Sequence, residues 1–149
     1  MTIAPVGTDD PELEKRLSDE LDKINSAAID ADDELPFSIR ATDEDGALVG
    51  GITGYTWGGC GGITSLWLAE EQRGKGIGAR LLAAAEAEIK RRGGDRVVVA
   101  TMSFQAPGFY LRHGYREVGR TPGMPGGTAK HHFHKSLPTI AGPVSSRRT

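Results

Sequence analysis

The residues best placed to do chemistry form a glycine-rich turn at positions 72–78, with the sequence Gln-Arg-Gly-Lys-Gly-Ile-Gly. A strand-like apolar segment precedes the turn, and a helical apolar pattern follows it. The first N–H groups of a helix lack partners within the helix, and the helix dipole favours negative charge there. Glycine lets the backbone approach a phosphate closely, while Arg73 and Lys75 add positive charge. The turn therefore predicts an anion site at the start of a helix.

Two better-known nucleotide-binding loops do not fit this turn. A P-loop needs the pattern Gly-x4-Gly-Lys-Ser/Thr, which the spacing excludes. The dinucleotide-binding fingerprint needs a third glycine or alanine where this chain has Leu81. Taken alone, the turn indicates either an anion site or a purely structural helix entry.

Several side chains are candidates to take a proton from a substrate. Alternation along a strand places His132 and His134 on one face and His131 on the other. Surface or packed histidines are the simpler interpretation, and a metal site lacks a clear third ligand. Glu70 and Glu71 lie beside the turn, where solvation is the simpler interpretation. The general base therefore stays open, and a water chain would need none of these residues.

Three aromatic side chains, Tyr55, Trp57 and Trp67, are candidates to line a pocket for a flat or cationic amine, or to pack in the core. Cys60 lies in a glycine turn with no neighbouring histidine in the sequence to activate it. We therefore expect no covalent cysteine chemistry.

The elements that must position these residues follow from apolar spacing and from turn residues. Residues 11–28 form an amphipathic helix with Asp9 or Asp10 as its cap, and residues 31–36 form an acidic linker. After this linker we expect three antiparallel strands, a long helix, a buried strand, a short helix and two further strands. Their ranges are 37–42, 47–56, 63–68, 76–91, 97–101, 106–113, 115–120 and 129–137.

This order predicts an α+β fold with a mixed, mostly antiparallel sheet flanked by helices. The apolar run 97–101 is typical of a strand at the sheet centre that is buried on both faces. Gly50, Gly51 and Gly54 suggest bulges or a close backbone neighbour. We expect one domain over residues 1–137 and a disordered tail over 138–149.

Composition sets further limits on the function. The 149 residues carry a net charge of −2, but residues 1–45 hold 14 acids and 4 bases, whereas the remainder holds 6 acids and 14 bases. The bases are scattered without an aromatic stripe, so we expect no nucleic-acid partner. One cysteine allows no internal disulfide, and no segment resembles a membrane span or a signal peptide. The expectation is a cytoplasmic protein that does not bind membranes.

Two ordered motifs resemble the GNAT superfamily of N-acetyltransferases. The segment 66–82 resembles the acetyl-CoA signature Gln/Arg-x-x-Gly-x-Gly/Ala, which Arg73, Gly76 and Gly78 match. Downstream, Ala106-x-x-Phe-Tyr-x-x-x-Gly-Tyr115 resembles the second signature, Ala-x-x-Leu/Phe-Tyr-x-x-x-Gly-Phe. The order of strands and helices from residue 37 to 137 also matches, so the resemblance covers about two-thirds of the chain.

The resemblance implies a role for each matching position. The strand end would offer backbone groups to the pantetheine arm and the acetyl carbonyl, the turn would hold the pyrophosphate, and Tyr110 would act as general acid on the departing thiolate. The family often has Asn where this chain has Ser103, whose hydroxyl can donate one hydrogen bond instead of two. The cofactor-binding residues implied in this way are Leu66, Trp67, Leu68, Arg73, Gly74, Lys75, Gly76, Ile77, Gly78, Ala79 and Ser103.

The implied function is transfer of an acetyl group from acetyl-CoA, without a metal, to a primary amine that attacks directly in a ternary complex. A small molecule is the expected acceptor, such as an antibiotic or a polyamine-like compound, because the acidic first segment would attract a cation. A non-catalytic acyl-CoA-binding or regulatory module and a protein N-terminal or lysine acetyltransferase are the alternatives. The N-terminal helix would cover either the acceptor side or a homodimer surface.

Overall fold

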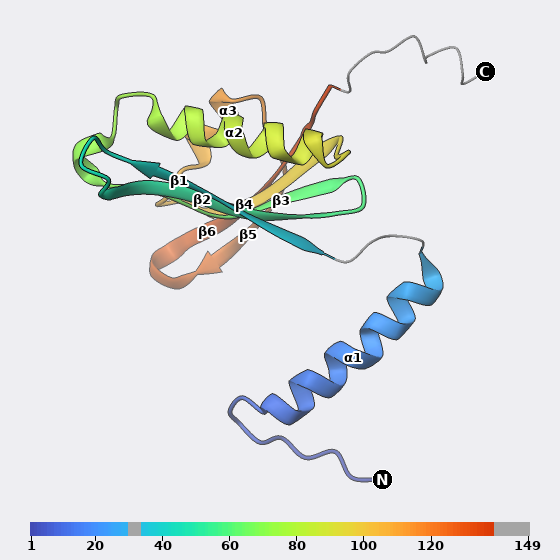
Figure 1. The fold of residues 1–149 in the computed structure, drawn as a ribbon. Coiled ribbons are helices and arrows are strands. Elements are labelled where there is room, and N and C mark those ends of the chain that lie inside the picture. Colours follow the sequence, from blue (N-terminus) through green and yellow to red (C-terminus); the bar gives the residue numbers. More distant parts are fainter. Residues whose placement is uncertain (30–33, 139–149) are drawn as a thin grey trace. The chain divides into compact units, whose positions relative to one another are not determined.

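The structure is a computed structural model that describes residues 1–29 and 34–138 (Figure 1). The chain divides into two compact units, Met1–Asp32 and Asp33–Thr149. The expectation of one domain over residues 1–137 stays a prediction. Of the expected acidic linker, residues 31–33 lie outside the described residues, as does the expected tail beyond Pro138.

The first unit consists mainly of helix α1, Pro11–Ala28. The Asp10 carboxylate accepts a hydrogen bond from the backbone N–H of Leu13 at 3.0 Å, and a proline fills the first helical position. The predicted helix and the second of its two candidate caps are therefore confirmed. None of its residues is buried, and the four side chains of its apolar face are 51% to 60% exposed. These side chains are Leu13, Leu17, Leu21 and Ile24.

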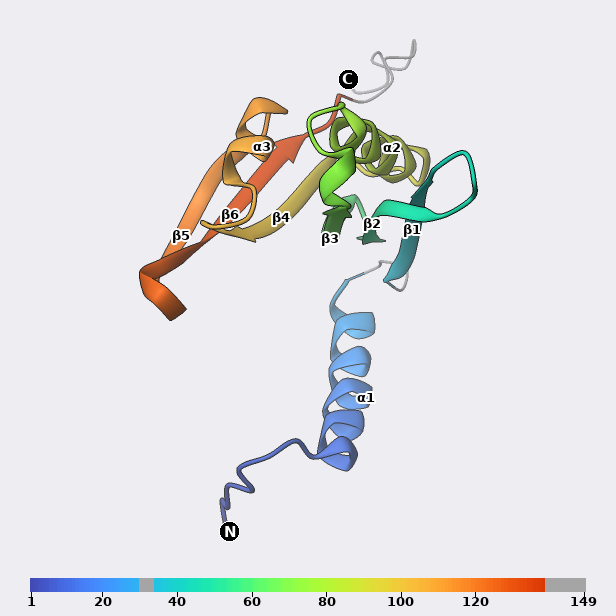
Figure 2. The same cartoon turned by 90° about the vertical axis from the view of Figure 1, so that its left-hand side faces the viewer.

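The second unit is built on a six-stranded sheet in the order β1-β2-β3-β4-β6-β5 (Figures 1 and 2). Only β3 and β4 pair in parallel, and every other neighbouring pair is antiparallel. The strands are β1 Leu35–Thr42, β2 Leu48–Trp57, β3 Cys60–Leu68, β4 Arg96–Met102, β5 Arg116–Met124 and β6 Thr128–Ser136. The mixed, mostly antiparallel sheet of an α+β fold is confirmed.

Helices α2, Ile77–Arg91, and α3, Pro107–Arg112, pack on the same face of this sheet (Figure 1). Helix α2 buries one side through an apolar pattern, and Ile89 is fully buried against Gly61 of β3. The helix ends where the N–H groups of Gly93 and Gly94 bond back to Lys90 and Ile89, as the glycine pair predicts. The buried residues of α2 are Leu81, Leu82, Ala85 and Ile89. This packing fixes the start of α2 above the sheet.

Strand β4 lies inside the sheet as predicted, but the expectation that it is buried on both faces is wrong. Its burial alternates: Val97, Val99 and Thr101 are buried, whereas Val98 is 36% exposed and Ala100 is exposed. A five-residue apolar run cannot reveal this difference, because exposed valine and alanine are common on protein surfaces. Thr101, at the end of the run, thereby shares the buried face with the core valines.

The predicted strands 47–56 and 63–68 leave too long a turn between them, because only Gly58 and Gly59 separate β2 from β3. Gly61 and Gly62 belong to β3, where a Cβ atom would collide with the side chains of Ile89 and Tyr55. Glycine is needed there for close packing and not for a turn. Leu35 and Pro36, placed in the expected linker, likewise belong to β1. Two short 3-10 helices, Glu70–Gln72 and Pro125–Gly127, complete the unit.

Candidate active site

A cleft opens where the two parallel strands separate. Strands β3 and β4 pair from Cys60–Arg96 to Ile63–Val99, and beyond that point they diverge (Figure 2). Thr64 is an extra residue in β3, since Ile63 and Ser65 face consecutive residues of β2. The bulge predicted from the glycines of β2 therefore lies beside Gly54. It bends β3 away from β4 and leaves a cleft of about 750 Å³ between them.

Six of the predicted site residues line this cleft. They come from the end of β3, from the turn after it, and from α3. They are Leu66, Trp67, Leu68, Arg73, Gly78 and Tyr110. The fold therefore brings the two motifs, separated by about 30 residues in the sequence, to one cleft.

The glycine-rich turn has the geometry that an anion site requires. Gly76 caps α2 with φ of 81°, and Gly74 has φ of 78°, a region that glycine tolerates and other residues rarely adopt. No acidic residue lies in the first turn of α2 to offset the positive end of its dipole. A Cβ atom at either glycine would meet nothing within 4 Å, so the backbone there is open to a ligand.

The two cations of the turn are held close to the strand end. The Nε atom of Arg73 donates a hydrogen bond to the backbone carbonyl of Leu68 at 3.2 Å. The Nζ atom of Lys75 donates to the Gln72 amide oxygen at 3.4 Å. Arg73 therefore spans the end of β3 and the turn, and it places positive charge where the cleft meets the start of α2.

Tyr110 is one of the residues that line the cleft. Its ring packs edge-on against Tyr115 with centroids 5.4 Å apart and contacts Phe133 at 6.0 Å, and the residue is only 4% exposed. Among the described residues, none is hydrogen-bonded to its hydroxyl group. Burial raises the pKa of Tyr110 to about 12, so the phenol keeps its proton at neutral pH. A protonated hydroxyl that lines a cleft and has no bond to a described residue can donate to a ligand.

Residues 7–115 match the family model described as the acetyltransferase (GNAT) family. The chain belongs to this family. It is 38% identical over 102 residues to a protein named blasticidin-S acetyltransferase from Streptomyces morookaense, a match that covers 68% of this chain and 75% of that protein. An acetyltransferase from Agrobacterium fabrum is 34% identical over 110 residues, covering 74% of this chain and 80% of the relative.

Solved structures agree with this family membership. The crystal structure of an acetyltransferase from Bacillus cereus superposes with a TM-score of 0.83 at 28% identity, covering 90% of this chain and 98% of that chain. The chain is therefore an acetyl-CoA-dependent N-acetyltransferase of the GNAT type.

The other predicted cofactor residues of this acetyltransferase lie beside the cleft or point elsewhere. Gly74, Lys75, Gly76 and Ala79 belong to the turn and the first turn of α2 but do not line the cleft. The side chain of Ile77 lines a separate hollow of about 300 Å³ between β1, β2 and α2. The hydroxyl of Ser103 accepts a hydrogen bond from the backbone N–H of Ala129 at 3.1 Å, so it ties the end of β4 to β6.

Sequence reasoning missed several cleft residues. Thr101, Phe104, Gln105 and Phe109 line the cleft together with Thr64 and Ser65. Burial alternation along β4 was the available signal for Thr101. No sequence pattern singles out Phe104 and Gln105, because their contacts depend on how the loop closes onto β4.

None of the candidate bases lines the cleft. His131 is buried, and its Nδ1 atom lies 3.2 Å from the Glu117 carboxylate. Hydrogen bonds from Arg120 and His131 hold the pKa of Glu117 below its usual value. His132 and His134 lie on the opposite face of β6, as the alternation predicted, and Glu70 and Glu71 are exposed in a 3-10 helix. A water chain remains compatible with this arrangement.

Of the three candidate aromatic residues, only Trp67 lines the cleft, where it is 53% exposed. Tyr55 packs over Gly62, and Trp57 lies at the far end of β2. Burial raises the pKa of the Cys60 thiol, which disfavours the reactive thiolate. A raised pKa makes the Cys60 thiol a weaker nucleophile at neutral pH.

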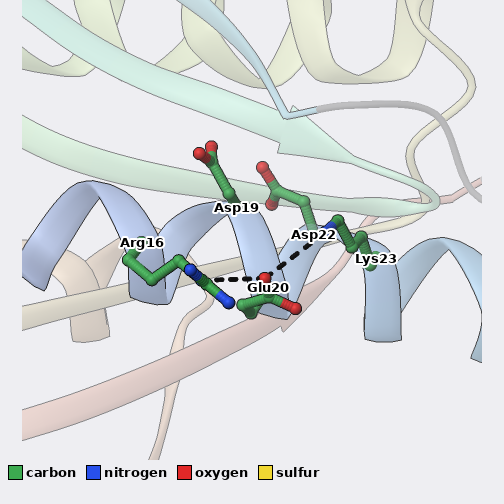
Figure 3. A pocket seen from close by; sticks show the side chains of 5 residues that line it. All are labelled: Arg16, Asp19, Glu20, Asp22 and Lys23. Carbon is green, nitrogen blue, oxygen red and sulfur yellow. Dashed lines mark hydrogen bonds and ion pairs between the residues drawn. The ribbon is translucent and has the colours of Figure 1, made fainter.

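A second hollow lies on the polar side of α1 (Figure 3). There Glu20, which is half-buried, pairs with the largely exposed Arg16 at 2.9 Å and Lys23 at 3.3 Å. Exposed pairs at this helical spacing contribute little to stability and indicate a solvated face.

Within the described residues, no group of three or more histidine, cysteine or acidic side chains could hold a metal ion. None of the described helices is long and apolar enough to cross a membrane.

Proposed function

We propose that this acetyltransferase moves an acetyl group from acetyl-CoA to a primary amine of a small molecule, by direct attack within a ternary complex. The observation that supports this most is the Tyr110 hydroxyl, which is protonated and belongs to the wall of the cleft where β3 and β4 separate. The open backbone of residues 73–79 is suited to the pyrophosphate of the cofactor.

In the proposed reaction the amine nitrogen attacks the thioester carbonyl carbon, and backbone groups at the end of β3 stabilise the oxyanion. The carbon–sulfur bond then breaks with its electron pair on sulfur. The sulfur takes the proton of Tyr110, and the tyrosinate recovers, through water, the proton that the attacking nitrogen loses after the carbon–nitrogen bond has formed. The sum is one amide and one free thiol for each acetyl-CoA and amine consumed.

The proposal of a small-molecule acceptor has two supports. A relative 38% identical to this chain is named for acetylation of blasticidin S. The first 45 residues carry 14 acids against 4 bases, and such a field attracts cationic amines. An antibiotic or a polyamine-like compound is therefore the proposed class.

The experiment is a thiol-release assay with the purified protein and acetyl-CoA. The amine panel contains blasticidin S, a linear polyamine, free lysine and a peptide with a free N-terminus, and mass spectrometry checks each product for one added acetyl group. We expect release above background hydrolysis with at least one small amine. Turnover confined to the peptide would indicate a protein acetyltransferase. Tight CoA binding without release for any amine would refute the proposed transfer.

A further inference from the structure

The loop between β4 and α3 is held by one side-chain amide. The Oε1 atom of Gln105 accepts a hydrogen bond from the backbone N–H of Met102 at 2.8 Å and a second from the hydroxyl of Thr101 at 3.2 Å. That hydroxyl in turn accepts a bond from the backbone N–H of Ala106 at 3.3 Å. The backbone N–H of Gln105 also donates to the Met102 carbonyl at 2.9 Å. The start of α3 is thereby fixed to the end of β4.

This network determines which way the amide faces. The oxygen and nitrogen of a glutamine amide are assigned from their hydrogen-bond partners, and a backbone N–H can only donate. The atom facing Met102 must therefore be the oxygen. The Thr101 hydroxyl oxygen accepts a hydrogen bond from the backbone N–H of Ala106, so its own proton is directed to the Gln105 oxygen. The Gln105 amide nitrogen must face the other way.

The Gln105 NH2 group has two donors and no bond to any described residue. The residue is exposed and lines the cleft, next to Thr101, which is 5% exposed. The hydroxyl of Ser103 accepts from the backbone N–H of Ala129 and keeps its own proton, but no bond to a described residue fixes the direction of that proton. The bonds from Met102 and Thr101 therefore fix the orientation of the Gln105 amide in the cleft wall. Its two N–H donors are left for a ligand.

We propose that the Gln105 amide donates a hydrogen bond to a carbonyl of the pantetheine arm of bound CoA, and that Thr101 is the positioning residue that orients it. The inference rests on the proposed function, because it needs the arm to enter this cleft. The arm carries two amide carbonyls, and the opposite wall is the unpaired edge of β3. A strand edge and a fixed amide facing each other suit a ligand that bears peptide-like groups.

Two substitutions at one position separate the contact to the ligand from the contact to the loop. Gln105→Glu keeps an oxygen for Met102 and Thr101 but loses both amide donors. Gln105→Met has a similar length and no charge, and it loses the donors and the acceptor. Calorimetric titration with CoA gives the dissociation constant of each variant. The same titration with adenosine 3′-phosphate 5′-diphosphate, which is CoA without its arm, gives the reference.

We expect both variants to bind CoA about three- to tenfold more weakly, the effect of losing one hydrogen bond, and to bind the armless fragment within about twofold of wild type. Gln105→Glu with wild-type affinity for CoA would overturn the inference even if Gln105→Met fails to fold. Equal weakening for CoA and the fragment would overturn it as well, because the effect would then not come from the arm. A wild-type protein that binds neither ligand would refute the proposed function itself.

The role of Thr101 is tested by a matched pair at that position. Thr101→Ser keeps the hydroxyl, and we expect CoA affinity within about twofold of wild type. Thr101→Val keeps the shape but leaves Ala106 N–H and Gln105 Oε1 each one partner short, so we expect the weakening seen with Gln105→Glu. Valine and serine variants with equal affinity would show that Thr101 does not orient the amide.

Discussion

Replacing Tyr110 with phenylalanine should remove the acid of the reaction and leave the fold intact. The ring contacts with Tyr115 and Phe133 depend on the aromatic ring and not on the hydroxyl. Because that hydroxyl has no bond to a described residue, its loss should change the free energy of unfolding by less than about 1 kcal/mol. A positioned general acid contributes about 10²- to 10⁴-fold to the rate, or about 3 to 5.5 kcal/mol of barrier. We therefore expect kcat and kcat/KM to fall together by about this factor.

The chain offers a matched control in its other buried tyrosine. Tyr115 is 3% exposed, and its hydroxyl donates to Glu86 on α2 at 2.7 Å. Glu86 also holds Lys135 Nζ at 3.0 Å, so the bond ends on a charged, partly buried group. Tyr115→Phe should lower the free energy of unfolding by about 1.5 to 3 kcal/mol and leave kcat within about threefold of wild type.

The assay measures thiol release at saturating acetyl-CoA for both variants, and denaturant unfolding gives their stability. The two substitutions should have opposite profiles, one catalytic and one structural. Wild-type kcat in Tyr110→Phe would refute the assignment of the acid. Equal losses of kcat in both variants would show that the effect comes from packing around the ring pair.

The raised pKa of Tyr110 extends this prediction to pH. With a pKa of about 12, the phenol stays protonated from pH 7 to pH 10. The profile of kcat should then show no alkaline loss due to this group in that range. A fall of kcat centred below pH 10 that disappears in Tyr110→Phe would contradict the burial argument.

Three further substitutions, the last with a matched control, test the turn and the packing of α2 on β3. Arg73→Gln removes a charge and the bond to Leu68, so CoA should bind about tenfold more weakly at low salt, with a smaller loss at high salt, measured by calorimetry. Gly76→Ala puts a side chain at φ of 81°, and a melting curve should show a loss of about 1 to 2 kcal/mol. Gly61→Ala places a Cβ atom against the side chain of Ile89 and should lower the free energy of unfolding by about 1 to 3 kcal/mol. Its control is Gly59→Ala, where the nearest neighbour of the new Cβ lies at 3.5 Å. That variant should lose less than about 0.5 kcal/mol in the same unfolding experiment.

Features encoded by local signals could be predicted from the sequence. The cap of α1 and the succession of strands and helices along the chain follow from residues close together in the sequence. The length of β3 could not be predicted, because Gly61 and Gly62 look like turn residues until Ile89 and Tyr55 are seen beside them. A single sequence does not distinguish a glycine that is needed for close packing from a glycine that is needed for a turn.

The candidate site divides in the same way. Arg73, Gly78 and Tyr110 belong to motifs whose spacing could be recognised, and the structure brings them to one cleft. Gln105 could not be assigned a role, because its partners Met102 and Thr101 become neighbours only when the loop closes back on β4. The three histidines show the reverse case: their residue type suggests proton transfer, but none of them lines the cleft.

The opening between β3 and β4 is encoded on both strands. Two parallel strands that pair at Cys60 would continue to pair unless their later edge groups are diverted. On β3 the extra residue Thr64 shifts the register and bends the strand. On β4 the N–H of Met102 donates to the Gln105 side chain and is therefore not available to pair with β3. The extra residue Thr64 in β3 does not depend on Gln105. Loss of the Gln105 contact should therefore loosen the cleft wall without closing the cleft. An effect on the affinity for CoA with an unchanged fold is therefore the expected sign of damage at this position.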